Sequence, residues 1–209
     1  PGRVSEQGYR GSLSSLFLTD EEALGNISFN PGGLVAVWAK QNTRDAIFDA
    51  LYQRQAYATS GPRIALQFSA GATSACGTHP DIAEGQTPMG GTLEKPAPPT
   101  ISFTVSAQRD NVALAKIQLV KGELWQGELR EKVFDLVNDA SGRSSACVVW
   151  EDEAFNVNAP SYWYARVSEI PTPRWSKLLC ESLQQCDDYP SADTMIQERA
   201  WSSPIWHLP

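Results

Sequence analysis

Few residues of this chain have the type and spacing needed for chemistry. Among its 209 residues are only two histidines, and one of them, His79, forms with Asp81 a close His-Pro-Asp pair in a stretch rich in Gly and Pro. Two interpretations are open: a substrate or metal contact carried on a loop, or a solvated loop histidine, which is the plainer one. We expect the second histidine, His207, to lie at the surface. Catalytic residues stay unassigned, because the sequence has neither a Gly-x-Ser-x-Gly elbow nor a phosphate-binding loop.

Arginines are the other candidates for contact with an anionic substrate, because a guanidinium can bind phosphate or sulfate through two parallel hydrogen bonds. The alternative is a structural arginine that pairs with a carboxylate or stacks on tryptophan. The sequences Arg174-Trp175 and Arg199-Ala200-Trp201 favour that alternative. The candidates are Arg63, Arg166, Arg174 and Arg199. With His79 and Asp81, we retain Arg166 and Arg174 as predicted substrate contacts.

The acidic triplet Glu151-Asp152-Glu153 follows a predicted strand. Calcium takes about six to eight oxygen ligands, and the spacing here does not match an EF-hand loop. We therefore interpret the triplet as a solvated turn.

Seven tryptophans are many for a chain of this length. A carbohydrate-binding module would place two or three of them on an exposed face. Four lie outside clear alternation, namely Trp125, Trp175, Trp201 and Trp206, and the first three are the candidates for binding. The alternative is a Trp-rich core in which the indole N–H groups find partners. Trp38, Trp150 and Trp163 lie within strand patterns and are predicted to be core.

Four cysteines bear on the cellular compartment. Cys180 and Cys186 enclose five residues, a suitable loop for a disulfide, and this pairing predicts an exported protein, periplasmic or secreted. The alternative is two free thiols in a cytosolic protein. Cys76 and Cys147 are candidates for a second bridge, whose connectivity the sequence does not decide. The spacings do not fit a zinc knuckle.

Charge and hydropathy exclude several partners. The chain has 17 Lys and Arg and 24 Asp and Glu, which gives a formal net charge of −7, and its sequence contains no cluster of Lys and Arg. Nucleic acid and anionic membrane surfaces are therefore poor partners. No apolar run approaches the roughly 20 residues of a membrane span.

Residues 30–68 read as a β-α-β unit. A strand is predicted at 34–39. A helix follows, with an N-cap supplied by Asn42 and Thr43 and apolar spacing from Ala46 to Arg54. Thr59-Ser60-Gly61-Pro62 ends the helix, and a strand is predicted over 63–68. Such strands need neighbours on both sides, and residues 1–29 are too polar to supply them. We therefore expect residues 1–61 to be the end of an α/β region belonging to a longer protein.

The rest of the chain is predicted to be β. Residues 70–99 form a long loop rich in Gly and Pro. Short alternating strands follow near 101–105, 116–121, 134–136, 146–150 and 161–168, and a last strand is expected within 199–206, where Pro204 marks an edge or a break. Residues 172–193 look irregular. We predict a mainly β fold, with a β-sandwich-like domain over residues 62–209.

Several segments, in order along nearly the whole chain, resemble a bacterial family of unknown function related to the PHP (polymerase and histidinol phosphatase) metal-dependent hydrolases. They include Asn30-Pro31-Gly32-Gly33-Leu34-Val35-Ala36-Val37-Trp38-Ala39 and residues 42–51, 57–64, 88–91, 117–122, 131–133, 164–167, 174–176 and 196–206. The resemblance implies a distorted α/β barrel followed by a β-rich region. It also places the metal ligands upstream of Pro1.

The resemblance therefore implies that residues 1–61 close a PHP-like barrel whose N-terminal portion is the partner of this chain. Divalent metal ions are expected in the parent protein and none in this fragment. The parent would be a phosphoesterase-type hydrolase, and the fragment alone would be inactive, with a structural or substrate-shaping role.

Two other interpretations stay open. One is a non-enzymatic binding module, with carbohydrate as its ligand. The other is a structural lobe, which predicts an exposed apolar patch around residues 34–51 and self-association through it.

Overall fold

The structure is a computed structural model that describes residues 32–72, 74–76, 85–95, 97–190 and 194–209. The chain divides into two compact units. The larger contains Leu34–Ile170 and Arg199–Pro209, and the smaller contains Pro1–Gly33 and Pro171–Glu198. Among the described residues, no helix combines the length and the apolar character needed to cross a membrane.

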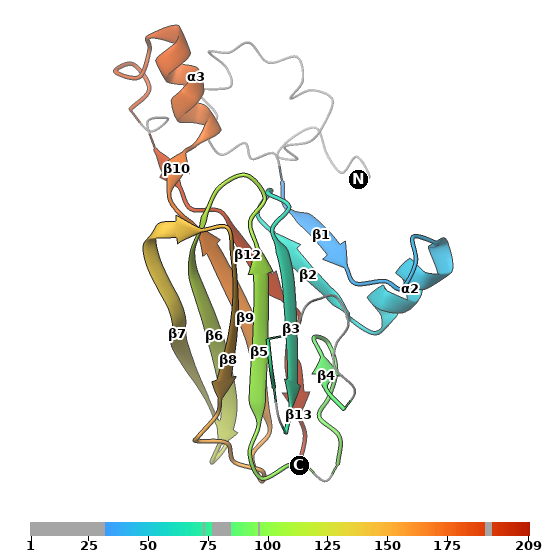
Figure 1. The fold of residues 1–209 in the computed structure, drawn as a ribbon. Coiled ribbons are helices and arrows are strands. Elements are labelled where there is room, and N and C mark those ends of the chain that lie inside the picture. The colour runs from blue at the N-terminus through green and yellow to red at the C-terminus, as the bar shows by residue number, and fades with distance from the viewer. Residues whose placement is uncertain (1–31, 73, 77–84, 96, 191–193) are drawn as a thin grey trace. The chain divides into compact units, whose positions relative to one another are not determined.

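The larger unit is built on two antiparallel sheets (Figure 1). The seven-stranded sheet has the order β1 (Leu34–Val37), β2 (Ala56–Thr59), β12 (Arg199–Ser202), β9 (Ser161–Glu169), β6 (Leu114–Trp125) and β7 (Glu128–Arg143), with β13 (Ile205–His207) also paired to β9. The four-stranded sheet has the order β4 (Thr87–Pro88), β3 (Ala65–Gly71), β5 (Ser102–Gln108) and β8 (Ser145–Glu151). These pairings confirm the mainly β prediction.

One hydrophobic core joins the two sheets. Alternate residues of β3 and β5, such as Phe68 and Phe103, point inward from the smaller sheet, and alternate residues of β6 and β9, such as Leu119 and Trp163, point inward from the larger one. The rings of Phe103 and Trp163 lie 5.0 Å apart, centroid to centroid. All four side chains are 0–1% exposed. The period of two along each strand therefore produces a sandwich-like core.

The prediction of a β-α-β unit over residues 30–68 is wrong. The helix is present as α2 (Arg44–Tyr52). Of the two residues predicted to supply its N-cap, Thr43 is the one that does, because its Oγ1 accepts a hydrogen bond from the Ala46 N–H at 3.3 Å. The helix ends earlier than predicted, with Arg54 at φ 58°, and an unpredicted strand, β2, returns antiparallel to β1. The strand predicted over 63–68 is β3, in the other sheet.

The seven-stranded sheet also runs across residue 61, where the sequence predicted a domain boundary. β1 and β2 lie before that residue, and β12, which pairs with β2, lies after it. Residues 1–31 are outside the described residues, so the PHP-like barrel remnant over residues 1–61 stays a prediction.

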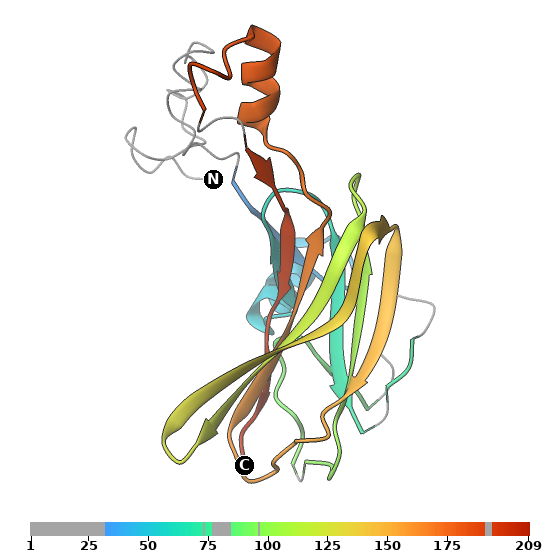
Figure 2. The ribbon, with the colours of Figure 1, turned by 90° about the vertical axis from the view of Figure 1, so that its left-hand side faces the viewer.

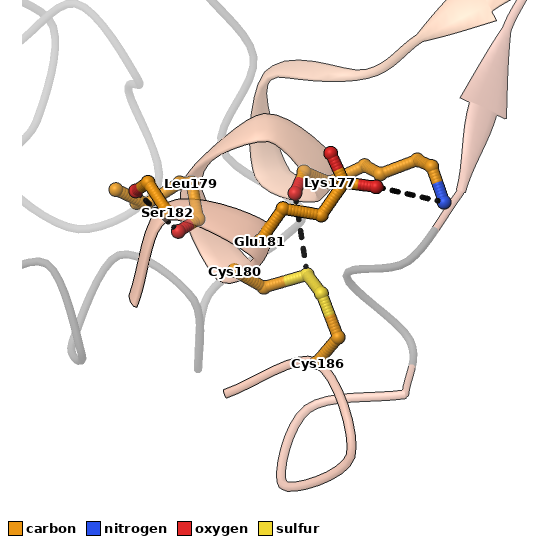
Figure 3. The surroundings of a disulfide bond; sticks show 6 residues. All are labelled: Lys177, Leu179, Cys180, Glu181, Ser182 and Cys186. Atoms are coloured by element: carbon orange, nitrogen blue, oxygen red, sulfur yellow. Dashed lines mark hydrogen bonds and ion pairs between the residues drawn. A yellow bond between two sulfur atoms is a disulfide. The ribbon is translucent and has the colours of Figure 1, made fainter. Parts of the chain in front are cut away.

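The described residues of the smaller unit form one helix, α3 (Trp175–Leu183), and a short antiparallel pair, β10 (Thr172–Pro173) with β11 (Met195–Ile196). The prediction that residues 172–193 are irregular is therefore wrong for Trp175–Leu183, which form this helix. Cys180 and Cys186 form the predicted disulfide (Figure 3). Cys180 is fully buried and packs with Leu179, Leu183 and Tyr189, so the bridge fastens the chain after α3 to the buried side of the helix.

A second disulfide joins Cys76 to Cys147, with a Cα–Cα distance of 5.8 Å. It ties the segment that follows β3 to β8. The described cysteines include none that is free.

Candidate functional site

A cleft of about 740 Å³ lies between β7 and β8, the last strands of their respective sheets. Its walls come from these two strands, its floor from the end of β6, and one side from the turn that follows β8. Figure 2 shows the β6–β7 hairpin extending away from the smaller sheet. The two sheets end here without a strand that joins them within the described part of the chain.

A buried ion pair forms the floor of the cleft. Lys121 Nζ lies 2.8 Å from Asp152 Oδ2 and 3.4 Å from Glu123 Oε2, and it donates to the Ala154 carbonyl at 2.9 Å. Lys121 is 7% exposed and Asp152 is 3% exposed. Two charges this far from solvent need close partners, because the free-energy cost of their desolvation is otherwise uncompensated.

Asp152 has its carboxylate fixed from several sides. It accepts hydrogen bonds from Trp163 Nε1 at 3.0 Å and from the Ala154 N–H at 3.1 Å. Its own N–H donates to the Ile101 carbonyl at 3.0 Å. The carboxylate is therefore positioned before any ligand arrives. The interpretation of the acidic triplet as a solvated turn is wrong for this central residue.

The walls of the cleft combine aromatic rings with charge. The rings of Phe134 and Trp150 lie 4.6 Å apart and are tilted by 44°, and Lys132 Nζ lies 4.8 Å from the centroid of Phe134. Three cationic and five anionic side chains line the cleft. An excess of carboxylates disfavours a phosphate or sulfate group and favours hydroxyl or amino groups that donate hydrogen bonds.

The sequence matches the family described as "Protein of unknown function (DUF3604)" over residues 5–142 and 136–209. The chain belongs to this family. Over 59 residues it is 41% identical to an "Uncharacterized protein" of Chlamydia muridarum (strain MoPn / Nigg), a stretch that makes up 28% of this chain and 8% of that protein. The chain therefore covers a small part of that relative's length. No solved structure matches it.

The DUF3604 match names no activity, so the predicted relationship to PHP-like hydrolases stays a prediction. Among the described residues, no group of three or more His, Cys, Asp or Glu side chains is placed to hold a metal ion.

Of the predicted contact residues of the DUF3604 chain, the two that the structure describes, Arg166 and Arg174, do not line the cleft. His79 and Asp81 lie outside the described residues. Arg166 lies on β9 and donates from Nε to Gln118 Oε1 at 2.8 Å. Arg174 precedes α3 in the smaller unit, and its guanidinium carbon lies 5.6 Å from the ring of Trp175, which is the stacking alternative that the sequence favoured. Arg166 and Arg174 belong to different units.

The sequence had predicted His207 at the surface, but the structure buries it. It is 2% exposed, its Nε2 lies 2.8 Å from the Val157 carbonyl oxygen, and its ring meets Phe155 edge-on. The period of two along β13 explains the error, because Trp206 takes the outward position and its neighbours turn inward.

The tryptophans divide largely as predicted. Trp163 is fully buried, and Trp38 and Trp150 are half-buried against the core. Trp125 is 38% exposed at the tip of the β6–β7 hairpin, and Trp206 is 37% exposed. Trp175 and Trp201 are half-buried.

Sequence reasoning missed the residues that form the floor of the cleft. Lys121 follows Ile117 and Leu119 at intervals of two, which places it on the inward face of β6. A lysine at such a position predicts a buried acidic partner. That signal was present, although it does not identify Asp152.

Proposed function

We propose that this chain is the β lobe of a larger, PHP-like, metal-dependent hydrolase, and that its cleft holds the part of the substrate that does not react. The ordered sequence resemblance supports the PHP-like assignment. In this proposal the N-terminal portion of the parent supplies the divalent metal ions and their ligands. The present chain supplies shape and hydrogen-bonding groups, so alone it should not hydrolyse esters.

The cleft between β7 and β8 is the observation that carries this role. Its volume of about 740 Å³ falls within the range of small-molecule sites, about 300–1,000 Å³. Trp150 and Phe134 offer apolar faces, and the fixed Lys121–Asp152 pair resists deformation. Because carboxylates outnumber cations, the cleft suits a hydroxyl-rich or amino-bearing leaving group better than the phosphate itself.

The test compares two phosphate esters on the full-length, metal-loaded protein. One ester carries a large polyhydroxylated leaving group, and the other is 4-nitrophenyl phosphate. Trp150→Ala should raise KM for the first ester roughly tenfold with kcat unchanged, because it removes binding shared by ground and transition states. The second ester should be unaffected. The control is Trp125→Ala, at the hairpin tip outside the cleft.

Three outcomes would overturn the proposal. One is an equal effect of Trp150→Ala on both esters, and another is no effect on either. The third is metal-dependent hydrolysis by the isolated chain. Urea unfolding of each variant separates loss of binding from loss of folding.

We also propose an extracytoplasmic location, periplasmic or secreted. The two disulfides support it, because such bridges persist in oxidising compartments. An immunoblot of fractionated source cells would test both the location and the size of the parent. A band of 22.9 kDa alone, or a cytosolic band, would contradict the corresponding part.

A further inference from the structure

The outer face of the seven-stranded sheet carries a group of aromatic side chains that the cleft does not use. Along β9, Trp163, Ala165 and Val167 are fully buried. The alternate residues Tyr162 and Tyr164 therefore point to the opposite face, and both are half-buried. They lie side by side with rings 6.5 Å apart and nearly parallel, at 14°.

The strand registers bring more groups to this face. Trp206 of β13 pairs with Tyr162, and their ring centroids lie 5.5 Å apart. Trp201 of β12 pairs with Arg166, which follows Tyr164 on the same face. We call Tyr162, Tyr164, Trp201 and Trp206 the aromatic face. β12 and β13 pair with the same edge of β9, one after the other along that strand (Figure 1).

A glycine fixes how Tyr162 lies. Gly122 of β6 pairs with Tyr162, and a Cβ atom built on Gly122 would lie 2.2 Å from Cζ of the Tyr162 ring. The ring therefore rests against the backbone of β6. A side chain at residue 122 would push the ring away from the sheet.

Fixed polar groups border the rings. Glu131 accepts a hydrogen bond from the Tyr162 hydroxyl at 3.2 Å. Gln118 donates to Asp135 at 2.6 Å and accepts from Arg166 at 2.8 Å. Burial, followed by the bond to Glu131, raises the pKa of Tyr162, so the phenol stays protonated at neutral pH. Its hydrogen is donated to Glu131, and its oxygen can accept a hydrogen bond from a ligand.

We propose that the aromatic face binds a neutral glycan chain. The C–H groups on one side of a pyranose ring carry slight positive charge and pack on the negative face of an aromatic ring, while its hydroxyls exchange hydrogen bonds with amide, carboxylate and guanidinium groups at the edge. The carboxylates of Glu131 and Asp135 and the net charge of −7 disfavour an anionic polysaccharide.

This inference is independent of the proposed hydrolase role. The aromatic face uses the residues of β9 that alternate with the buried Trp163, the partner of Asp152. Glu131 is the one residue common to the cleft lining and the border of the aromatic face. Variants of Trp150 therefore test the cleft, and variants of Tyr162 and Trp206 test the aromatic face.

The experiment is a titration of the chain with neutral hexasaccharides (cello-, xylo-, manno-, malto- and chito-oligosaccharides), followed by tryptophan fluorescence and calorimetry. At least one should give saturable binding at millimolar concentration or below. Trp206→Ala and Tyr162→Ala should each weaken that binding roughly tenfold, about 1.4 kcal/mol. Gly122→Ala should weaken it too, although it removes no ring.

A matched control, Trp125→Ala, removes another exposed tryptophan and should leave glycan binding unchanged. Absence of saturable binding across the panel would overturn the proposal, as would binding that survives the Tyr162→Ala/Trp206→Ala double variant. A dimer in sedimentation that Trp206→Ala dissociates would also overturn it, because the aromatic face would then be a contact between two copies of the chain.

Discussion

Replacing Asp152 by asparagine is the sharpest test of the buried ion pair. The substitution keeps the size of the side chain but removes the charge that lies 2.8 Å from Lys121 Nζ. In asparagine an amide nitrogen, itself a donor, takes the place of one carboxylate oxygen. It would then face either the donors of Lys121 and Trp163 or the Ala154 N–H. The ammonium of Lys121 would then keep only Glu123, at 3.4 Å, as an ionic partner.

The expected loss of stability follows from these contacts. Breaking a buried pair by neutralising one member costs about 3–5 kcal/mol, and the remaining contact to Glu123 places this case near 3 kcal/mol. With an m-value of about 2 kcal/mol/M in urea, the unfolding midpoint should fall by about 1.5 M. Glu153→Gln is the control, because it makes the same charge change in the same triplet at an exposed side chain and should shift stability by less than about 0.5 kcal/mol.

The assay is urea unfolding of the oxidised chain followed by tryptophan fluorescence. Lys121→Met combined with Asp152→Asn should cost less than the sum of the two single changes by about 1–3 kcal/mol, because the pair is then removed together. Strict additivity, or an Asp152→Asn midpoint equal to that of Glu153→Gln, would refute the argument that this pair is a buried, coupled element.

Three further predictions concern other parts of the chain. Replacing both Cys76 and Cys147 by serine should cost roughly 4 kcal/mol in urea unfolding, against roughly 2 kcal/mol for the Cys180/Cys186 pair, because the sequence separations are 71 and 6; equal costs would contradict the loop-entropy reasoning. Hydrogen bonds from Ser141, then Arg143, lower the pKa of Asp139 to about 2, so the stability it adds is present above its unfolded pKa near 3.9 and is lost as pH falls through about 2. The stability difference between the native chain and Asp139→Asn should therefore be constant from pH 7 to about 5 and shrink below pH 4, and a carboxyl NMR titration with a midpoint near 4 would exclude this. Phe48 and Tyr52 are 63% and 79% exposed on α2 with their rings 6.2 Å apart, so Phe48→Ser/Tyr52→Ser should reduce self-association in sedimentation, whereas Leu129→Ser on the hairpin should not; association that persists in the double variant would contradict a role for this patch.

Patterns with a short period could be predicted from the sequence. The alternation in 101–105, 146–150 and 161–168 correctly gave β5, β8 and β9, and Thr43 with the apolar stripe after it gave α2. Each of these signals is local, because it depends on side chains a few residues apart on one strand or helix.

Pairing between distant segments could not be read in the same way. Ala56–Thr59 forms β2, which pairs with β1 on one side and β12 on the other. β12 comes about 140 residues later in the chain, and the four residues of β2 do not indicate either neighbour. Asp152 is buried because Lys121, Trp163 and Ile101 meet it from three separate strands or loops. Long-range contacts of this kind override the local polarity of the acidic triplet.

The alternation of inward and outward side chains along β6 and β9 also couples the cleft to the aromatic face. On β9, Trp163 faces Asp152 while Tyr162 and Tyr164 face outward, and on β6, Lys121 faces inward while Gly122 faces Tyr162. A slip of one residue would exchange the two sets, burying the tyrosines and exposing the tryptophan. The Lys121–Asp152 pair on one side and the Gly122–Tyr162 contact on the other both oppose that slip. Loss of either should therefore disturb both surfaces, so Gly122→Ala should also change the unfolding midpoint, whereas Trp206→Ala should leave it nearly unchanged.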